Sequence, residues 1–551
     1  MADPRRRAAD VASTLALVFC LVGSAHGTVP HFEEVALEEG ILFQHVNGVT
    51  PEKPLPTTYG SGAAFFDLEG DGDLDVYLVN GGSLRAGRGT AINGLFRNDV
   101  TTGGPRYARV AEAAGAPGVG YGMGVLAGDY DGDGDTDLYC TELGSDRLYV
   151  NDRYGVFHDA TLSEGLGGSS WGTSAAYLDA DLDGDLDLFV VDYVQYDPDN
   201  NPWCGRRDLG LRLYCDPLEF PATPDRLYNN RGGGAGPRFV EVGAASGITA
   251  RGNGLGVVAA DFDGDGDTDL YVANDMTPNL FYENDGAGVF VDRALMLGTA
   301  LSADGAAQAG MGVDAADYDE DGDPDLIVTN YQLEHNALYR NEGDWWTDLS
   351  FVAGIGEHSL NHLGFGAGFF DMDNDGWLDL FVTNGHVHDN IESYDPIVTH
   401  AQRVQVMRNE AGRFDDVTDE VGLQQRFVGR GSAFGDYDAD GDVDILVSSN
   451  GMSAALLRNE GGGGQSIRVK LRGPAGNLPA AGATAIVVIG TRRLTRWAKV
   501  GTGYLSTSET ALHFGIGDSS VADSLIVRWP RGGESVLTRV PAGEVTVTAG
   551  Q

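Results

Sequence analysis

The sequence predicts an all-β protein, a seven-bladed β-propeller with cation-binding hairpin loops followed by a small C-terminal β domain. Three observations predict this fold. An acidic nonapeptide recurs seven times, a β-rich apolar run follows each copy, and an aromatic residue opens a short strand seven times. Between the copies no useful length of sequence has the 3.6-residue apolar period of an amphipathic helix.

The composition is that of a large, acidic, folded chain. Its 551 residues include 82 acidic and 36 basic side chains, and the formal net charge is -46. A hydrophobic content of 42% suffices for a large core, which argues against intrinsic disorder. Because the acidic excess repels phosphate backbones and anionic lipids, we expect no nucleic-acid partner and no polybasic membrane attachment.

Residues 1–27 have the pattern of a secretory signal peptide. Arg5, Arg6 and Arg7 supply a basic start, residues 11–22 an apolar segment, and residues 25–27 a small-residue cleavage site. An uncleaved membrane anchor is the alternative, but this apolar segment is too short to span a bilayer and no later one reaches roughly 18 residues. We expect a secreted chain, extracellular or periplasmic, with no membrane span after cleavage.

Three cysteines remain after that cleavage. In an oxidising compartment Cys204 and Cys215 are expected to form a disulfide that closes a short loop. Cys140 lies in an apolar run, where a buried structural thiol is the expected state.

The repeated unit defines a predicted propeller over residues 28–460. A glycine lies seven residues before each nonapeptide, and a final strand of each unit ends near an asparagine. The unit is therefore predicted as an aromatic strand, a second strand, an acidic loop, a third strand and a closing strand. Because one four-stranded blade cannot bury both faces, seven blades are expected to close into a ring. A linear β-solenoid is the alternative, and the long, variable units disfavour it.

The acidic loops have the ligand chemistry of Ca²⁺ sites. Carboxylates at positions 1, 3, 5 and 9 crowd like charges that a cation would neutralise, glycine at position 6 permits a sharp turn, and the position 7 carbonyl adds a ligand. An EF-hand is excluded because position 12 is apolar. Solvated aspartate-rich turns are the alternative, which seven copies with aspartate at position 5 and glycine at position 6 disfavour.

We therefore predict about seven structural Ca²⁺ ions, since Mg²⁺ resists being wrapped by protein oxygens. The predicted metal-site residues, in odd-numbered order along each loop, are Asp67, Glu69, Asp71, Asp73 and Asp75; Asp129, Asp131, Asp133, Asp135 and Asp137; Asp179, Asp181, Asp183, Asp185 and Asp187; Asp261, Asp263, Asp265, Asp267 and Asp269; Asp317, Asp319, Asp321, Asp323 and Asp325; Asp371, Asp373, Asp375, Trp377 and Asp379; and Asp436, Asp438, Asp440, Asp442 and Asp444.

These repeats resemble FG-GAP/VCBS repeats, as found in integrin α-subunit propellers. The segments at residues 467–473, 501–506, 512–517 and 525–530 are similar to an ASPIC/UnbV domain, here residues 461–551. Together they resemble the cartilage acidic protein family over nearly the whole mature chain. The resemblance implies a secreted Ca²⁺-binding propeller with adhesion or recognition roles. The chain departs from the loop pattern at Glu69 and Trp377, of which the glutamate is expected to weaken its site.

Long insertions are predicted to lie on the face opposite the acidic loops. Strand alternation places residues 81–94, 192–224 and 385–405 there, and long ordered loops on a rigid scaffold usually carry binding. We expect an extracellular protein or glycan ligand on that face. The tail after residue 460 is locally basic, which suits either docking on the acidic propeller or a solvated face.

No catalytic motif is present: neither G-x-S-x-G nor H-E-x-x-H, no phosphate loop, and no cysteine with an evident catalytic partner. The expected function is a non-enzymatic extracellular recognition or adhesion module. Two alternatives stay open, a propeller enzyme that acts on glycans and an accessory protein of natural-product biosynthesis.

Overall fold

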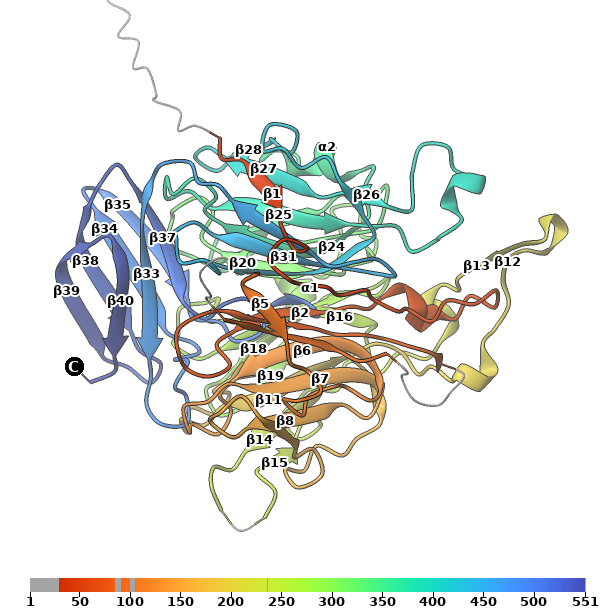
Figure 1. The fold of residues 1–551 in the computed structure, drawn as a ribbon, viewed down its shortest axis with the longest axis horizontal. Helices are drawn as coiled ribbons and strands as arrows, with labels where there is room; N and C mark the ends of the chain where they lie inside the picture. Colours follow the sequence, from red (N-terminus) through yellow and green to blue (C-terminus); the bar gives the residue numbers. More distant parts are fainter. Residues whose placement is uncertain (1–28, 85–90, 100–104, 235, 551) are drawn as a thin grey trace, which may run out of the picture.

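The computed structural model describes residues 29–84, 91–99, 105–234 and 236–550, so the expected signal segment lies outside the described residues. The described chain is all-β, with strands in sheets that surround a common centre and a separate pair of sheets at one side (Figure 1). Among the described residues no helix has the length and apolar character needed to cross a bilayer.

The chain up to Asn459 forms antiparallel groups of four strands in the part that the structure describes. The first three are β2 (Ala63–Phe66), β3 (Asp75–Leu78), β4 (Gly94–Asn98) and β5 (Tyr107–Arg109); β6 (Tyr121–Gly128), β7 (Asp137–Gly144), β8 (Arg147–Asn151) and β9 (Phe157–Asp159); and β10 (Ser170–Leu178), β11 (Asp187–Asp192), β14 (Arg226–Asn230) and β15 (Phe239–Glu241). Strands β7 and β10 also pair, which joins the second and third groups into one eight-stranded sheet.

Four more groups follow along the chain. They are β16 (Gly254–Ala260), β17 (Asp269–Asn274), β18 (Leu280–Asn284) and β19 (Phe290–Asp292); β20 (Val313–Ala316), β21 (Asp325–Val328), β22 (Ala337–Asn341) and β23 (Trp346–Asp348); β24 (Gly364–Phe370), β25 (Asp379–Asn384), β27 (Gln405–Asn409) and β28 (Phe414–Asp416); and β30 (Gly429–Gly435), β31 (Asp444–Ser449), β32 (Ala455–Asn459) and β1 (Phe32–Glu34).

The remaining short elements lie in connections. They are the strands β12 (Cys204–Arg206), β13 (Leu211–Leu213), β26 (Gln402–Arg403) and β29 (Arg426–Phe427), the helices α1 (Ala294–Leu297) and α2 (Ile355–Ser359), and the 3-10 turns η1 (Leu55–Thr58), η3 (Pro198–Asn200), η4 (Arg207–Leu209), η5 (Pro217–Glu219) and η6 (Ile391–Ser393).

The pairing corrects the predicted order of strands within a unit. Each aromatic strand pairs with the closing strand that precedes it in the sequence, as β5 does with β4, instead of opening the next group. The N-terminal strand β1 has no preceding group and pairs with β32, where Phe32 lies opposite Asn459. The last group is therefore completed by the start of the chain, which links the two ends of the repeat region.

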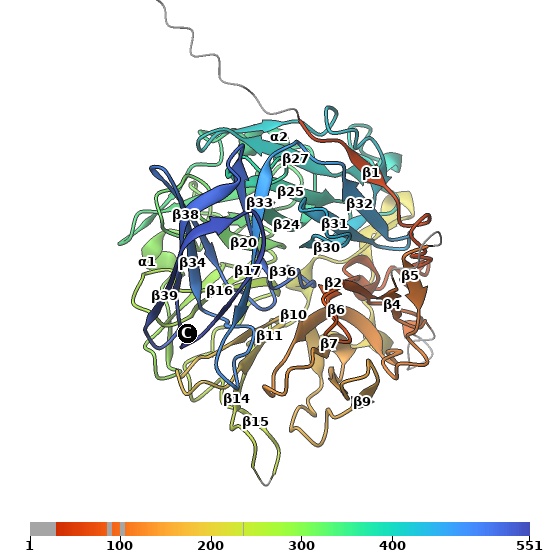
Figure 2. The same cartoon turned by 60° about the vertical axis from the view of Figure 1, so that its left-hand side comes forward.

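The first strands of the groups lie side by side around the centre (Figure 2). In order, β2, β6, β10, β16, β20, β24 and β30 each contact the next, and β30 contacts β2. Apolar side chains fill the space between neighbouring groups; Phe65 and Val76 of the first group, for example, share a buried cluster with Leu446 and Leu456 of the last. This arrangement is that of a β-propeller.

Asparagines at the ends of closing strands connect neighbouring groups. Each side-chain amide donates to a main-chain carbonyl of the adjacent group over 2.7 to 3.2 Å. The seven donor–acceptor pairs are Asn98 with Tyr437, Asn151 with Leu68, Asn230 with Tyr130, Asn284 with Ala180, Asn341 with Phe262, Asn409 with Tyr318 and Asn459 with Met372. These buried amides satisfy carbonyls that no strand pairs.

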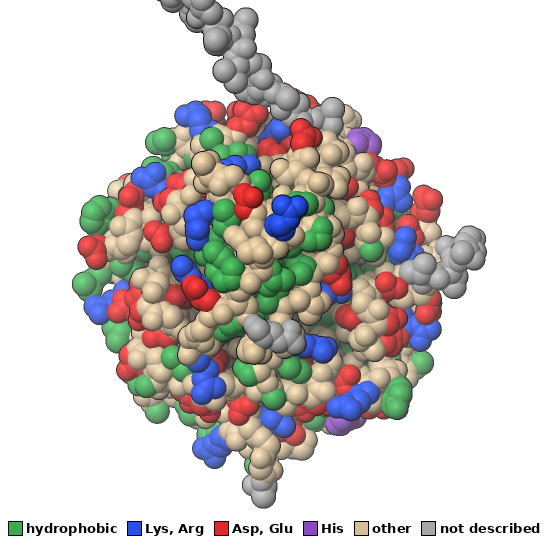
Figure 3. All heavy atoms as spheres, turned by 90° about the vertical axis from the view of Figure 1, so that its left-hand side faces the viewer, with side chains coloured by type: hydrophobic (Ala, Val, Ile, Leu, Met, Phe, Trp, Pro, Cys, Tyr) green, Lys and Arg blue, Asp and Glu red, His purple; other side chains and the backbone are tan. Residues whose placement is uncertain are grey.

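The C-terminal residues form two sheets of their own around a second apolar core. One sheet contains β33 (Gln465–Arg472), β37 (Leu512–Gly517) and β40 (Gly543–Thr548), and the other β34 (Thr484–Ile489), β35 (Arg492–Trp497), β38 (Val521–Arg528) and β39 (Glu534–Pro541). Basic side chains of this part bind the acidic hairpins: Arg492 pairs with Glu320, and Arg531 donates to the Asp183 carbonyl over 3.0 Å. The C-terminal sheets thus dock on the acidic-loop side, where acidic and basic side chains intermingle (Figure 3).

One segment of the C-terminal part, the central strap (residues 498–511), runs into the centre of the ring. It contains β36 (Gly503–Tyr504), which pairs with β16, and its carbonyls at Val500, Leu505 and Thr507 accept main-chain hydrogen bonds from β10, β6 and β2 respectively. The hydroxyl of Tyr504 reaches the Tyr59 carbonyl at 2.8 Å. The strap therefore fills the channel that the inner strands surround.

Candidate functional site

The acidic hairpins connect the first and second strands of each group and bring carboxylates together. In the fifth hairpin, oxygens of Asp317, Asp319 and Asp325 lie within 4.8 Å of one another. The same spacing holds for four other sets: Asp129, Asp131 and Asp137; Asp179, Asp181 and Asp183; Asp261, Asp263 and Asp265; and Asp371, Asp373 and Asp379. Positions 1 and 3, together with 5 or 9, thus converge as the sequence predicted.

Two left-handed backbone positions recur in all seven hairpins. Glycine at position 6 has a left-handed φ of 96° to 101°, which is the sharp turn that the sequence predicted. Position 4 is also left-handed, with φ of 55° to 76°, although four copies have Leu182, Glu320, Asn374 or Ala439 there. This second turn was not predicted, although glycine at position 4 in the other three copies is its signal in the sequence.

Hydrogen bonds orient the side chains at positions 5 and 9. The position 7 N–H donates to the position 5 carboxylate over 2.8 to 3.1 Å in every copy. The position 9 carboxylate accepts the N–H of the closing-strand asparagine over 2.7 to 2.9 Å. The side chain at position 7 takes no part in these bonds, which explains why Trp377 is tolerated; its ring instead lies 5.0 Å from the Arg492 guanidinium.

The first hairpin differs from the others at position 3. Glu69 Oε1 lies 3.4 Å from Arg97 Nε. Burial raises the pKa of Glu69, and the Arg97 charge opposes that rise. An arginine therefore compensates this carboxylate in part, as Arg408 does for the position 3 carboxylate Asp373 of the sixth hairpin over 2.8 Å.

Burial disfavours the charged form of the carboxylates at position 9. Burial raises the pKa of Asp75 to about 8 and that of Asp325 to about 9, against the hydrogen bonds donated by Asn98 and Asn341. Both carboxylate oxygens of Asp317 and one oxygen of Asp325 are buried without a hydrogen-bond partner. Buried carboxylate oxygens that lack donors and converge on one point fit a hard divalent cation. These Asp clusters therefore have the donor set of metal-ion sites.

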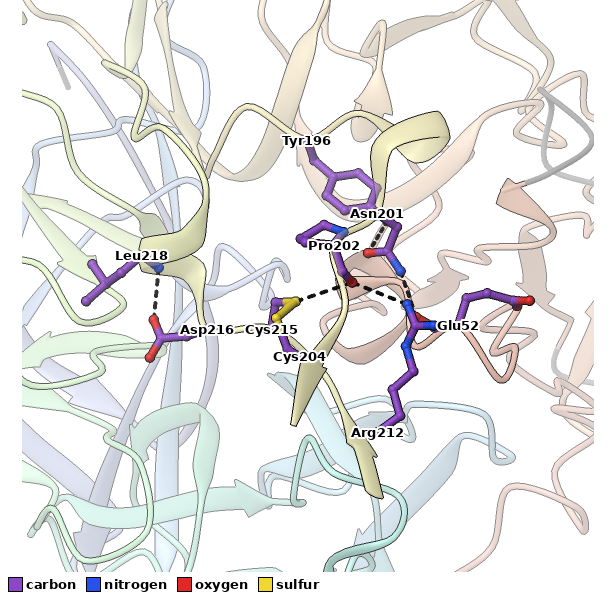
Figure 4. Close-up of a disulfide and its surroundings, with 9 residues drawn as sticks. All are labelled: Glu52, Tyr196, Asn201, Pro202, Cys204, Arg212, Cys215, Asp216 and Leu218. Carbon is purple, nitrogen blue, oxygen red and sulfur yellow. Dashed lines mark hydrogen bonds between the residues drawn. A yellow bond between two sulfur atoms is a disulfide. The ribbon is translucent and has the colours of Figure 1, made fainter. Parts of the chain in front are cut away.

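The long insertions meet on the opposite side of the ring (Figure 1). The 192–224 insertion contains the hairpin of β12 and β13, and the predicted Cys204–Cys215 disulfide is confirmed there (Figure 4). Asn390 of the 385–405 insertion donates to the Arg212 carbonyl over 3.2 Å. Of residues 81–94 the described Ser83 and Leu84 line, with other residues of this side, a groove of about 1040 Å³. We call this side the insertion face.

A fourth segment of the insertion face was missed by the sequence analysis. Residues 46–59, which precede the first group, contribute Glu52, whose carbonyl accepts from the Asn201 amide at 2.7 Å (Figure 4). Lys53 from the same segment pairs with Asp389 and lies 5.1 Å from the centre of the Tyr214 ring. No long insertion or acidic motif marked this segment in the sequence. Cys140 is buried, and burial raises the pKa of its thiol well above the ordinary range, as expected for a structural thiol.

At the centre of the insertion face lies a cavity of about 290 Å³, here called the central pit. Tyr59, Tyr331, Glu334 and Asp275 line it together with His388. Asp275 Oδ2 lies 2.9 Å from the Tyr59 hydroxyl and 2.5 Å from the Tyr193 hydroxyl. Burial raises the pKa of Asp275 to about 6, against these two hydrogen bonds. This carboxylate was not predicted, because a lone acid after strand β17 belongs to no sequence motif.

Comparisons with known proteins agree with the two-part organisation. The FG-GAP-like repeat model matches residues 67–140, 129–190, 221–272, 261–328 and 317–382, together more than half of the chain, and the ASPIC and UnbV model matches residues 473–551. Cartilage acidic protein 1 of Homo sapiens is 25% identical over 517 residues, covering 89% of this chain and 71% of that protein. The Xenopus tropicalis protein of that name is 26% identical over 511 residues, covering 89% and 73%.

Solved structures give more distant similarities. An Agrocybe aegerita lectin that recognises non-reducing terminal N-acetylglucosamine aligns with a TM-score of 0.39 and 15% identity, over 72% of this chain and 94% of that chain. A Bacillus licheniformis rhamnogalacturonan lyase aligns with a TM-score of 0.38 and 12% identity, over 78% and 75%.

Proposed function

Because this chain belongs to the FG-GAP-like repeat family and ends in an ASPIC and UnbV domain, we propose that it is a secreted, calcium-binding, seven-bladed β-propeller. It acts outside the cell, or in the periplasm, as a non-enzymatic recognition module. The acidic hairpins hold structural Ca²⁺, and the insertion face binds an extracellular protein or glycan. The seven groups of strands and the contact between β30 and β2 support the closed ring.

The observation that carries this proposal is the convergence of buried carboxylates in the hairpins. Asp317, Asp319 and Asp325 place oxygens within 4.8 Å, and several of these oxygens are buried without a hydrogen-bond donor. Like charges buried this close together destabilise the folded state unless a cation neutralises them. When bound, Ca²⁺ supplies that neutralisation. The protein's own contribution is the repeated backbone turn, which holds the carboxylates at positions 1, 3, 5 and 9 in place.

Recognition is assigned to the insertion face because the acidic-loop face is already in use. The C-terminal sheets dock on the acidic-loop side through Arg492 and Arg531, whereas the two-stranded sheet of β12 and β13 on the insertion face belongs to the 192–224 insertion itself. Three segments distant in sequence meet there, and the Cys204–Cys215 disulfide constrains one of them. Constrained loops on a rigid scaffold lose little entropy when they bind.

The test measures calcium binding and partner binding in separate experiments. Purified mature protein is analysed for bound calcium by elemental analysis, and its melting temperature is measured with and without EDTA. A variant in which a short Gly-Ser linker replaces residues 196–219 is then compared with wild type for capture of exported proteins and on a glycan array. We expect about seven bound ions, a lower melting temperature in EDTA, and loss of binding in the variant with calcium unchanged.

Three outcomes would overturn parts of the proposal. An identical melt in EDTA, together with far fewer than seven ions, would remove the role of calcium. Unchanged partner binding by the deletion variant would remove the assignment of the insertion face. Release of new reducing ends from a glycan panel by the wild-type protein would show an enzymatic function instead.

A further inference from the structure

The central pit is an acidic cavity at the middle of the insertion face. Asp275, Glu334 and Asp216 line it, and no lysine or arginine is found among its described lining residues. Asp275 is 5% exposed, and among the described residues its carboxylate accepts hydrogen bonds from two neutral tyrosine hydroxyls, those of Tyr59 and Tyr193. A carboxylate in such a place has no cation of the protein's own to compensate it.

The buried arginine of the insertion face, Arg430, is held by main-chain carbonyls. Arg430 is fully buried, and its guanidinium donates to the carbonyls of Thr58, Gly385 and Gly429 over 2.6 to 2.9 Å. Its charge therefore stabilises the loop backbone beneath the insertion face. The pit-lining His388 adds no positive charge near neutral pH, because burial lowers its pKa to about 4. One of its ring nitrogens, Nδ1, is buried and has no hydrogen-bond partner.

The walls of the pit are aromatic. Tyr59, Tyr214 and Tyr331 line it, and tyrosine faces attract ammonium and guanidinium groups. The protein itself contains an example, since Lys53 Nζ lies 5.1 Å from the centre of the Tyr214 ring. That lysine is held by Asp389 and is not part of the pit lining. The wall chemistry therefore suits an incoming cation with an apolar stem.

Exposed apolar side chains surround the pit. Met276, which lines it, is 37% exposed; Leu218 and Leu333, next to the lining residues Pro217 and Glu334, are 57% and 74% exposed. Tyr394 is 42% exposed, and its ring lies 6.4 Å from that of His388. An apolar surface around a buried polar centre has the anatomy of a protein–protein contact.

We infer that the central pit receives the side chain of a lysine or arginine from a protein partner, with Asp275 as the buried counter-charge and the tyrosine rings as walls. This inference rests on the proposed function, because it names the partner of the insertion face and the group recognised. The cationic end of the side chain pairs with carboxylate, its methylene stem contacts the rings and Met276, and the surrounding apolar residues contact the partner's surface.

The experiment uses arrayed decapeptides that are randomised at nine positions and have lysine, arginine, glutamine or glutamate fixed at the fifth. Full-length mature protein, calcium-loaded, is applied as wild type and as Asp275→Asn, Met276→Lys, Met276→Gln and Asp344→Asn. Asp344→Asn is the matched control, because Asp344 is exposed and lies outside the pit. Met276→Lys places a competing cation in the pit at a side chain that is already partly exposed.

The wild-type protein, Met276→Gln and Asp344→Asn should bind the lysine- or arginine-fixed pool about tenfold more strongly than the glutamine pool. Asp275→Asn and Met276→Lys should lose this preference while retaining the wild-type melting temperature and calcium content. If Asp275→Asn does not fold, Met276→Lys alone decides. Comparison of the lysine-fixed and arginine-fixed pools shows which of the two side chains the pit binds more strongly.

Equal binding of all four pools, or a preference that survives Met276→Lys, would overturn the inference. Binding confined to a glycan array, and sensitive to deletion of residues 196–219, would also overturn it but leave the proposed function standing. The proposed function itself would be contradicted if EDTA left the melting temperature unchanged and deletion of residues 196–219 left partner binding unchanged.

Discussion

The side-chain amide of Asn98 donates a hydrogen bond to the main-chain carbonyl of Tyr437, 339 residues later in the chain, over 3.2 Å. The same amide reaches the Leu74 carbonyl of its own hairpin at 3.3 Å. Six other asparagines make the equivalent bond to the group that precedes them, but this one joins the first group to the last. Asn98 thus lies at the point where the ring closes.

Asn98→Ala is expected to lower the free energy of unfolding by about 1–3 kcal/mol, because the buried Tyr437 carbonyl loses its side-chain donor, whereas the Leu74 carbonyl keeps the Tyr107 hydroxyl. The measurement is chemical denaturation followed by tryptophan fluorescence. Glu38→Ala, at an exposed position, is the control and should change stability by less than about 0.5 kcal/mol. An Asn98 variant as stable as the control would show that this bond does not contribute to closure.

Asp325→Asn is expected to remove one bound calcium ion from the protein. The change removes one carboxylate charge from the cluster of Asp317 and Asp319 but keeps the side-chain size and the acceptor for the Asn341 N–H. Elemental analysis after gel filtration measures the ion count, with Asp344→Asn as the control. An unchanged ion count would show that the fifth hairpin binds no calcium through this carboxylate.

Gly501→Ala tests the packing of the central strap. Gly501 has φ of +83°, and a Cβ there would lie 2.5 Å from the Ala175 carbonyl oxygen. Gly533 has φ of +99° with open space around it, so Gly533→Ala carries the same backbone strain without a clash. We expect the first variant to lose about 1–3 kcal/mol more stability than the second. Equal losses in thermal denaturation would show that the strap is loosely held.

Asp225 makes the stability of the protein depend on pH. Burial, together with the nearby Asp192 charge, raises its pKa to about 8, although the Asp192 N–H and Arg226 oppose the rise. A carboxyl whose pKa is raised on folding favours the folded state below its ordinary pKa near 4, and that stability is lost as pH rises through about 8.

Asp225→Asn should therefore flatten this part of the pH profile. Measured in saturating calcium between pH 5 and pH 9, the wild type should lose more stability than Asp225→Asn, whereas Asp344→Asn should follow the wild type. Parallel profiles for wild type and Asp225→Asn would assign the loss to other groups.

The disulfide is expected to stabilise the insertion without stabilising the ring. Replacing Cys204 and Cys215 by serine removes a closed loop worth about 3 kcal/mol in the chain-entropy model. Because the loop lies outside the stacked groups, we expect faster cleavage within residues 196–219 by a protease and a nearly unchanged global melt. A large fall in the global melting temperature would show that the insertion and the ring unfold together.

Local sequence was sufficient for the elements and for the hairpins. Short apolar runs bounded by glycine and asparagine predicted the strands, and the acidic nonapeptides predicted the convergence of positions 1 and 3 with 5 or 9. These are short-range consequences of alternation and turn chemistry, so nothing distant in the chain was needed. Local sequence did not assign the aromatic strand to a group, because this strand could pair either with the closing strand before it or with the strand after it.

The sequence by itself determined that the chain is all-β, repeats an acidic hairpin, forms the Cys204–Cys215 disulfide and ends in a second set of strands. Only the tertiary structure decided that β1 completes the last group, that the central strap fills the channel, and that Asp275 lies in a pit with tyrosines from other groups. The physical reason is distance along the chain. Each of these contacts joins residues more than about 50 positions apart, for which no local period or motif leaves a signal.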